Sequence, residues 1–149
     1  MVMVGLMYFV FDITSSSTKS NALSEVEYAT RFAAERIQRE IIGAAAFNVA
    51  QSTFGSTPGR LSLQTVSADT NPTIIQLVGR SIVIKQGAHA TQTITTPLVE
   101  VMSTTFYNLS RVGSPEVIQF TVSGRRLNPQ SMEEFQASTT LTSTATLRQ

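Results

Sequence analysis

The sequence predicts an α+β fold in which a long N-terminal helix packs on an antiparallel β-sheet head. Three observations support this class. Apolar side chains recur every three or four positions in residues 24–47, which is the spacing of one helix face. From about residue 60 onward apolar and polar residues alternate, which is the period of a strand. A chain of 149 residues has the length of one domain and can bury a core.

The chain opens with an apolar stretch from Met1 to Phe11 that ends before Asp12. A helix needs about 20 apolar residues to cross the hydrocarbon core of a bilayer, so this stretch has half the required length. No Lys or Arg precedes Lys19 and no small-residue cleavage site follows, which argues against a secretory signal peptide. Two interpretations remain at this point: a buried element of the domain's own core, and the rear part of a membrane helix.

The segment that follows, residues 12–23, reads DITSSSTKSNAL and consists of weak helix formers. A loop is one interpretation. The other, which we favour, is the polar middle of one continuous helix. Ser24 and Glu27 have capping-box spacing, and this pair either starts a helix or lies inside a longer one.

Residues 24–47 form an amphipathic helix in our interpretation, with one face against the sheet. Thr30 and Ala44 belong to the same face by spacing. The residues predicted to pack on the sheet are Val26, Ala33, Ile37 and Ile41.

The opposite side of this helix carries charges of alternating sign, four residues apart: Glu27, Arg31, Glu35 and Arg39. Each pair of this kind contributes about 0.2–0.5 kcal/mol to an isolated helix. We therefore interpret this side as a solvated helix face that carries a ladder of opposite charges.

The helix is expected to end between Ser52 and Gly59, where two glycines and a proline occur. Turn residues then separate several apolar runs, and Gly79-Arg80 within a β-branched stretch is a possible turn or bulge. We expect one meandering antiparallel sheet. Its alternating apolar residues are Leu61 and Leu63, residues 73–86, Val99 and Val101, Ile118, Phe120 and Val122, and residues 135–147.

Composition and motifs argue against catalysis, cofactors and nucleic-acid binding. The net charge is +1, only 14% of residues are charged, and there is no Cys. His89 is the single histidine and lies in the polar stretch GAHATQ. Glu133 and Glu134 are adjacent, so in a strand they point to opposite faces, and we interpret them as a solvated turn. We therefore expect no enzyme, no cofactor, no metal and no small-molecule substrate.

Two minor motifs leave alternatives open. Asp69, Thr70 and Asn71 offer oxygens for calcium, but calcium prefers 6–8 ligands, and a plain turn is the favoured interpretation. Asn108-Leu109-Ser110 fits an N-glycosylation sequon, a pattern that arises often by chance, and its use depends on the host.

Three stretches resemble the type IV pilin and pseudopilin family, and J-type minor pseudopilins in particular. RFAAERIQREIIGA, residues 31–44, looks like the end of that family's long helix. VIQFTVSG, residues 117–124, resembles its penultimate strand, and STATLRQ, residues 143–149, resembles its closing strand. The family's basic leader and the first half of its hydrophobic segment have no counterpart before Asp12, so we expect the natural start to lie upstream.

The resemblance implies a pilin-like fold with an N-terminal helical unit, residues 1–52, and a β-rich head, residues 53–149. Within the first unit, residues 1–12 belong in a membrane or filament core. The residues expected at this filament or membrane interface are Val2, Val4, Leu6, Met7, Phe9, Val10 and Phe11.

The implied function is a structural subunit of a type IV pilus or a type II secretion-like filament. Its partners are other pilin subunits, identical or different, and the lipid bilayer before assembly. Its location is the cytoplasmic membrane, then a cell-surface or periplasmic filament. The alternative is a soluble or surface-anchored β-rich binding or adhesion module. The sequence does not distinguish a major from a minor subunit. It also does not distinguish a filament for adhesion from one for motility, secretion or DNA uptake.

Overall fold

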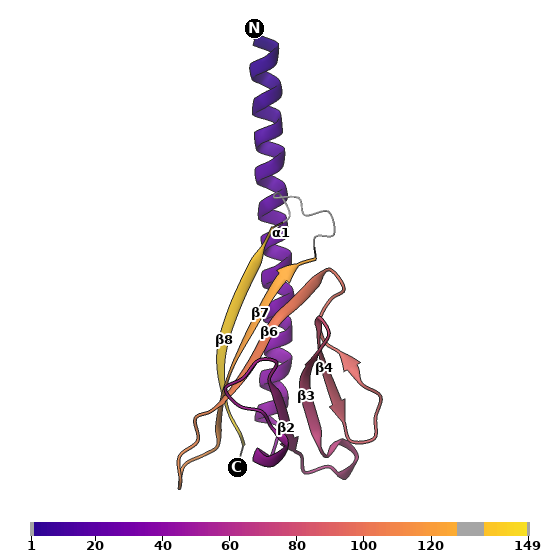
Figure 1. The fold of residues 1–149 in the computed structure, drawn as a ribbon, viewed down its shortest axis with the longest axis vertical. Helices are drawn as coiled ribbons and strands as arrows, with labels where there is room; N and C mark the ends of the chain where they lie inside the picture. Colours follow the sequence, from indigo (N-terminus) through magenta and orange to yellow (C-terminus); the bar gives the residue numbers. More distant parts are fainter. Residues whose placement is uncertain (1, 128–135, 149) are drawn as a thin grey trace.

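A computed structural model describes residues 2–127 and 136–148, with the backbone alone described for residues 2–18. It contains helix α1 (Val2–Ile42) and two antiparallel sheets (Figure 1). The α+β class and the long N-terminal helix are therefore confirmed.

Helix α1 runs without interruption through the polar segment at residues 12–23, as we expected. Ser24 accordingly lies inside the helix and does not begin it. In Figure 1 the N-terminal part of α1 projects beyond the strands, whereas its C-terminal part lies against them. The head therefore covers only one end of the helix.

The expected end of this helix, at residue 47 or later, is wrong. Helix α1 ends at Ile42 and Gly43 follows in a turn, with the Ala44 N–H donating to the Ile41 carbonyl at 3.1 Å. Gly is about 1 kcal/mol less favourable than Ala inside a helix. Residues 46–47 instead form a short strand, so residues 43–52 belong to the head and not to a helical unit of residues 1–52.

Five strands form the first sheet, in the order β1-β2-β3-β4-β5. Val78 pairs with Ser81 across a two-residue turn, and Gly79 there has φ +62°, so of the turn and the bulge left open for Gly79-Arg80 the structure has the turn. Two 3-10 helices, η1 (Val49–Gln51) and η2 (Ala68–Thr70), lie in the connections. The strands are β1 (Ala46–Phe47), β2 (Arg60–Gln64), β3 (Thr73–Val78), β4 (Ser81–Gln86) and β5 (Gln92–Thr93).

Three longer strands form a second sheet: β6 (Val99–Asn108), β7 (Val117–Arg126) and β8 (Ser138–Thr146). The expectation of one continuous sheet is thus wrong, although the strand positions agree with the alternating pattern. Alternation shows which side chains share a face, but it carries no information about which strands pair. Each strand pairs with its neighbour in sequence except that β5 and β6 do not pair, which places the boundary between the sheets after β5.

The core lies between α1 and the two sheets. Helix α1 packs directly on β7 and β8, and β6 contacts β2, β3 and β4 of the first sheet. Phe106 and Phe120 fill its centre with no exposed surface. The strand residues in this cluster are Phe47, Leu61, Leu63, Ile75, Ile82, Ile84, Val101, Phe106, Ile118, Phe120, Val122 and Ala145.

Candidate assembly surface on the N-terminal helix

Helix α1 contains two parts that differ in their relation to the head. Among the side chains that the structure describes, Ala22 is the first buried one along α1, and those at positions 19–21 are exposed. The helix backbone continues from there to Val2, which is roughly 30 Å at about 1.5 Å per residue. This free part includes the apolar stretch.

The residues predicted at a filament or membrane interface lie in this free part, and their backbone is helical. Their side-chain contacts fall outside what the structure describes. Within residues 2–127 and 136–148, no helix combines the length and apolar character that a membrane span requires. The seven positions are Val2, Val4, Leu6, Met7, Phe9, Val10 and Phe11.

The head-bound part of α1 buries the face that the spacing predicts. Val26, Ala33, Ile37 and Ile41 each have 0% exposed surface. Ala33, Ile37 and Ile41 belong to the main core cluster, together with residues of both sheets. Val26 packs in a smaller cluster with Val99 and Ala29. Thr30 is also buried, as expected.

Polar contacts tie the edges of this helix face to both sheets. The Gln86 side chain donates a hydrogen bond to Glu40 at 3.1 Å, and Glu40 also pairs with Arg36 at 2.9 Å. On the other sheet Arg126 pairs with Glu25 at 3.5 Å. These contacts fix the rotation of α1 about its own axis, so the opposite face is held toward solvent.

The solvent-facing side of α1 carries Glu27, Arg31, Glu35 and Arg39, which we call the charged stripe. The four side chains are exposed, and within the described part of the chain no ion pair or hydrogen bond engages them. The solvated helix face is therefore confirmed, although its opposite charges four residues apart form no ion pairs within the described residues. Exposed pairs gain little Coulomb energy in water and lose side-chain entropy, so such contacts are weak.

Two aromatic side chains border the charged stripe. Tyr28 is 72% exposed and Phe32 is 51% exposed, one helical turn apart. Large apolar side chains exposed next to one another on a rigid element are typical of interaction surfaces. The spacing analysis did not single them out, because it considered only the buried face.

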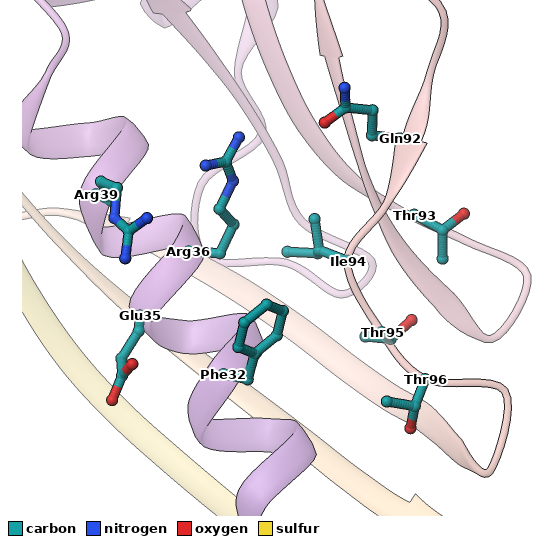
Figure 2. A pocket seen from close by; sticks show the side chains of 9 residues that line it. All are labelled: Phe32, Glu35, Arg36, Arg39, Gln92, Thr93, Ile94, Thr95 and Thr96. Carbon is teal, nitrogen blue, oxygen red and sulfur yellow. The ribbon is translucent and has the colours of Figure 1, made fainter.

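A groove of about 500 Å³ runs between α1 and the segment that contains β5. Figure 2 shows Phe32 and Arg36 extending from the helix toward Ile94, with Glu35 and Arg39 on the far side of the helix in this view. Arg36 is already paired with Glu40. The lining residues are Phe32, Glu35, Arg36, Arg39, Gln92, Thr93, Ile94, Thr95 and Thr96.

The other polar motifs lie apart from this groove. His89 is exposed in the turn after β4. Asp69 and Thr70 lie in η2, and the Asn71 side chain accepts a hydrogen bond from the Thr65 N–H at 3.4 Å, which fits a turn. Within the described residues no group of three His, Cys, Asp or Glu side chains is placed to hold a metal.

The structure describes the sequon at Asn108 but not the acidic pair. Asn108 ends β6, is exposed, and accepts a hydrogen bond from the Ser110 N–H at 2.9 Å. Glu133 and Glu134 lie outside the described residues.

An ion-pair cluster that the sequence analysis missed joins the two sheets. Glu100 on β6 is 7% exposed and pairs with Arg80 at 3.2 Å and with Arg125 on β7. Arg80 lies in the β3–β4 turn, so a carboxylate of the second sheet holds a turn of the first. The one local feature of the sequence that points to a buried Glu100 is its position between Val99 and Val101 in the apolar stretch LVEVM.

Comparison with known proteins adds no assignment: no family model, no curated protein and no solved structure matches this chain. What bears on function is therefore the geometry of α1 and the sequence resemblance given above.

Proposed function

We propose that this chain is a structural subunit, a pilin or minor pseudopilin, of a type IV pilus or a type II secretion-like filament. The observation that carries the proposal is helix α1, which extends from the buried residue Ala22 back to Val2 and begins with an apolar stretch. In this proposal the fold is pilin-like and the head is displayed outside a core of packed helices.

The apolar end of α1 requires partners other than its own head. Residues 12–23 form helix, and about 18 Å of helix therefore separates the apolar stretch from residue 24. Removing apolar surface from water contributes about 25 cal/mol per Å², so a lipid bilayer before assembly and neighbouring helices after assembly both stabilise this end. Head-to-tail contacts of this kind form open filaments.

The location follows from these partners: the cytoplasmic membrane first, then a cell-surface or periplasmic filament. The proposal assigns no catalysis, no cofactor, no small-molecule substrate and no direct nucleic-acid binding.

Deletion of residues 1–12 tests this function. We expect the shortened chain to lose vesicle flotation and to form no filaments in electron micrographs, while the melting temperature of its head changes by less than about 3 °C. A second variant, Leu6→Gln/Phe9→Gln/Phe11→Gln, retains the helix length and removes apolar surface. It is expected to lose the same two properties, which assigns them to apolarity.

Two results would contradict the proposal. One is a large fall in melting temperature on deletion, because the stretch would then belong to the domain's own core. The other is a full-length chain that neither floats with vesicles nor assembles.

A second candidate function, a β-rich binding or adhesion module, is favoured by the groove beside α1. Phe32, Glu35 and two arginines line it, one of them already paired with Glu40, so a partly apolar partner segment fits its chemistry. This candidate predicts a full-length chain that is monomeric and soluble without detergent, which sedimentation velocity measures directly.

A further inference from the structure

We propose that the outer edge of β8 binds an extended, uncharged segment of a different protein, which joins the second sheet as a fourth strand beside β6, β7 and β8. This edge, the side of Ser138–Thr146 that faces away from β7, is called the β8 edge below. That the edge is open follows from the head alone. That its occupant is a different protein, and not a second copy, rests on the proposed filament.

The β8 edge presents backbone groups that no described residue uses. The Leu147 N–H donates to the Glu116 carbonyl at 2.9 Å, and the Arg126 N–H donates to the Ala137 carbonyl at 2.9 Å, so the odd-numbered residues of β8 are those that bond to β7. In an antiparallel ladder the next residues along the strand direct their N–H and C=O groups to the other side. Within residues 2–127 and 136–148 no hydrogen bond engages these groups. They belong to Ser138, Thr140, Thr142, Thr144 and Thr146.

The β8 edge lacks the features that protect an edge strand from other chains. Such features are a very short strand, a charged residue, a proline, a bulge, or a segment laid over the edge. Strand β8 has nine residues, none of them charged and none proline, and its register with β7 is unbroken. Figure 1 shows β8 as the outermost strand of its sheet, with no labelled element beyond it.

The other sheet edges of the described chain are protected. The first sheet ends in β1 and β5, which have two residues each. Strand β6 contains a register shift, and the segment before β2 covers its outer edge. There the Gly55 N–H donates to the Phe106 carbonyl at 2.8 Å and the Gly59 N–H donates to the Thr104 carbonyl at 2.6 Å. The fold therefore leaves one long edge open.

The side chains of β8 indicate the chemistry of the added strand. On the solvent face Thr142 bonds Thr121 at 3.0 Å and Thr140 bonds Ser123 at 2.8 Å, so hydroxyl groups already pair between β7 and β8. Cross-strand pairs of this kind stabilise a sheet. On the other face Leu141 packs partly buried against the core, and a charge placed beside it would lose hydration. The edge therefore fits an uncharged strand with Ser or Thr at every second position.

A second copy does not fit this edge in the proposed filament. Because β8 is the one long open edge of the described chain, two copies join through β8 and β8, which requires a two-fold axis. An antiparallel pair reverses the direction of α1, which packs on β8. A parallel pair places the two α1 helices on opposite faces of the joined sheet. Neither pair brings the apolar helix ends together in one core.

Hydrogen exchange of the full-length chain in detergent tests whether the edge is open. Nuclear magnetic resonance is expected to show slow exchange of the Leu141 and Ser143 amides, which bond to β7, and fast exchange of the Thr142 and Thr144 amides. Slow exchange at all four positions would show that the edge is already covered and would overturn the inference.

A peptide tests strand addition to the unmodified chain. The probe is an acetylated and amidated copy of residues 138–146, which is uncharged, has Ser or Thr at every second position and carries no α1. It is expected to slow the exchange of the Thr140, Thr142 and Thr144 amides. The matched control is the same peptide with N-methyl groups at its own positions 140, 142 and 144, which removes the N–H groups that face β8. The control is expected to give no protection.

Two variants of the chain separate the backbone from the side chain. Thr142→Pro removes an N–H group that points away from β7, which is the position where an edge strand accepts proline. Thr142→Val keeps this N–H group and removes the hydroxyl. We expect Thr142→Pro to weaken peptide binding about tenfold or more and Thr142→Val to weaken it less than about threefold. Circular dichroism shows whether each variant is folded.

The outcomes separate this inference from the proposed function. No binding of the peptide at millimolar concentration, equal protection by the N-methyl peptide, or equal binding to a folded Thr142→Pro chain would overturn strand addition. Thr142→Pro is expected to form normal filaments, and their loss in a folded variant would assign the edge to a neighbouring subunit and overturn the inference. If the unmodified chain forms no filament, the proposed function fails, whereas the exchange and peptide results still decide whether the β8 edge binds a strand.

Discussion

Gly124 on β7 lies directly beneath Thr30 on α1: a Cβ atom on Gly124 would come within 2.6 Å of Thr30 Oγ1. It would also lie 3.4 Å from a methyl group of Val99. The Thr30 hydroxyl is buried and has no hydrogen-bond partner in the described part of the chain. The helix therefore crosses the second sheet at a position that accepts no side chain.

The first prediction concerns this crossing. Gly124→Ala is expected to lower the free energy of unfolding by about 1–3 kcal/mol, because the added methyl group overpacks the contact. Thr30→Ala should cost less than about 1 kcal/mol, since the buried hydroxyl makes no hydrogen bond to lose. The double variant should be more stable than the sum of the two changes predicts. Urea unfolding of the four proteins measures this, and strictly additive changes would show that the two residues do not meet.

The second prediction concerns the head-bound face of α1. Ile37→Asp is expected to unfold the head, because it places an unpaired carboxylate in a site with 0% exposure. Tyr28→Asp is the matched control: the same new residue, nine positions earlier on the same helix, at a side chain that is 72% exposed. Thermal unfolding followed by circular dichroism should separate them, and similar melting temperatures would mean that the helix face is wrongly assigned.

The third prediction concerns the cluster that joins the sheets. Glu100→Gln is expected to lower the free energy of unfolding by about 1–3 kcal/mol, because two arginines lose a charged acceptor. Glu35→Gln removes the same charge from an exposed, unpaired site and should change stability by less than about 0.5 kcal/mol. Denaturant titration compares them, and equal effects would assign no stabilising role to the cluster.

The fourth prediction concerns the single histidine. His89→Ala is expected to leave the melting temperature and filament assembly unchanged, because this side chain is exposed in a turn. Differential scanning calorimetry and electron microscopy of the variant are sufficient. Any hydrolytic activity of the unmodified chain that disappears on this change would contradict the assignment of a non-catalytic subunit.

The sequence by itself determined the features that depend on local periodicity. The three- and four-residue spacing placed Ala33, Ile37 and Ile41 on the buried face, and the two-residue period located the strands. Gly79-Arg80 marked a hairpin turn because Gly adopts a positive φ at little cost. Each of these signals lies within a few residues of the element that it predicts.

The tertiary structure decided what depends on contacts between distant residues. Ala46 and Phe47 pair with β2 where the spacing predicted helix, and the strands divide into two sheets because β5 and β6 do not pair. Sequence spacing predicted a solvated ladder of opposite charges along the charged stripe, and solvent competes for these exposed side chains, which form no ion pair within the described residues. Glu100 and Gly124 take their roles from partners on other elements, Arg80 and Thr30, which no local pattern identifies.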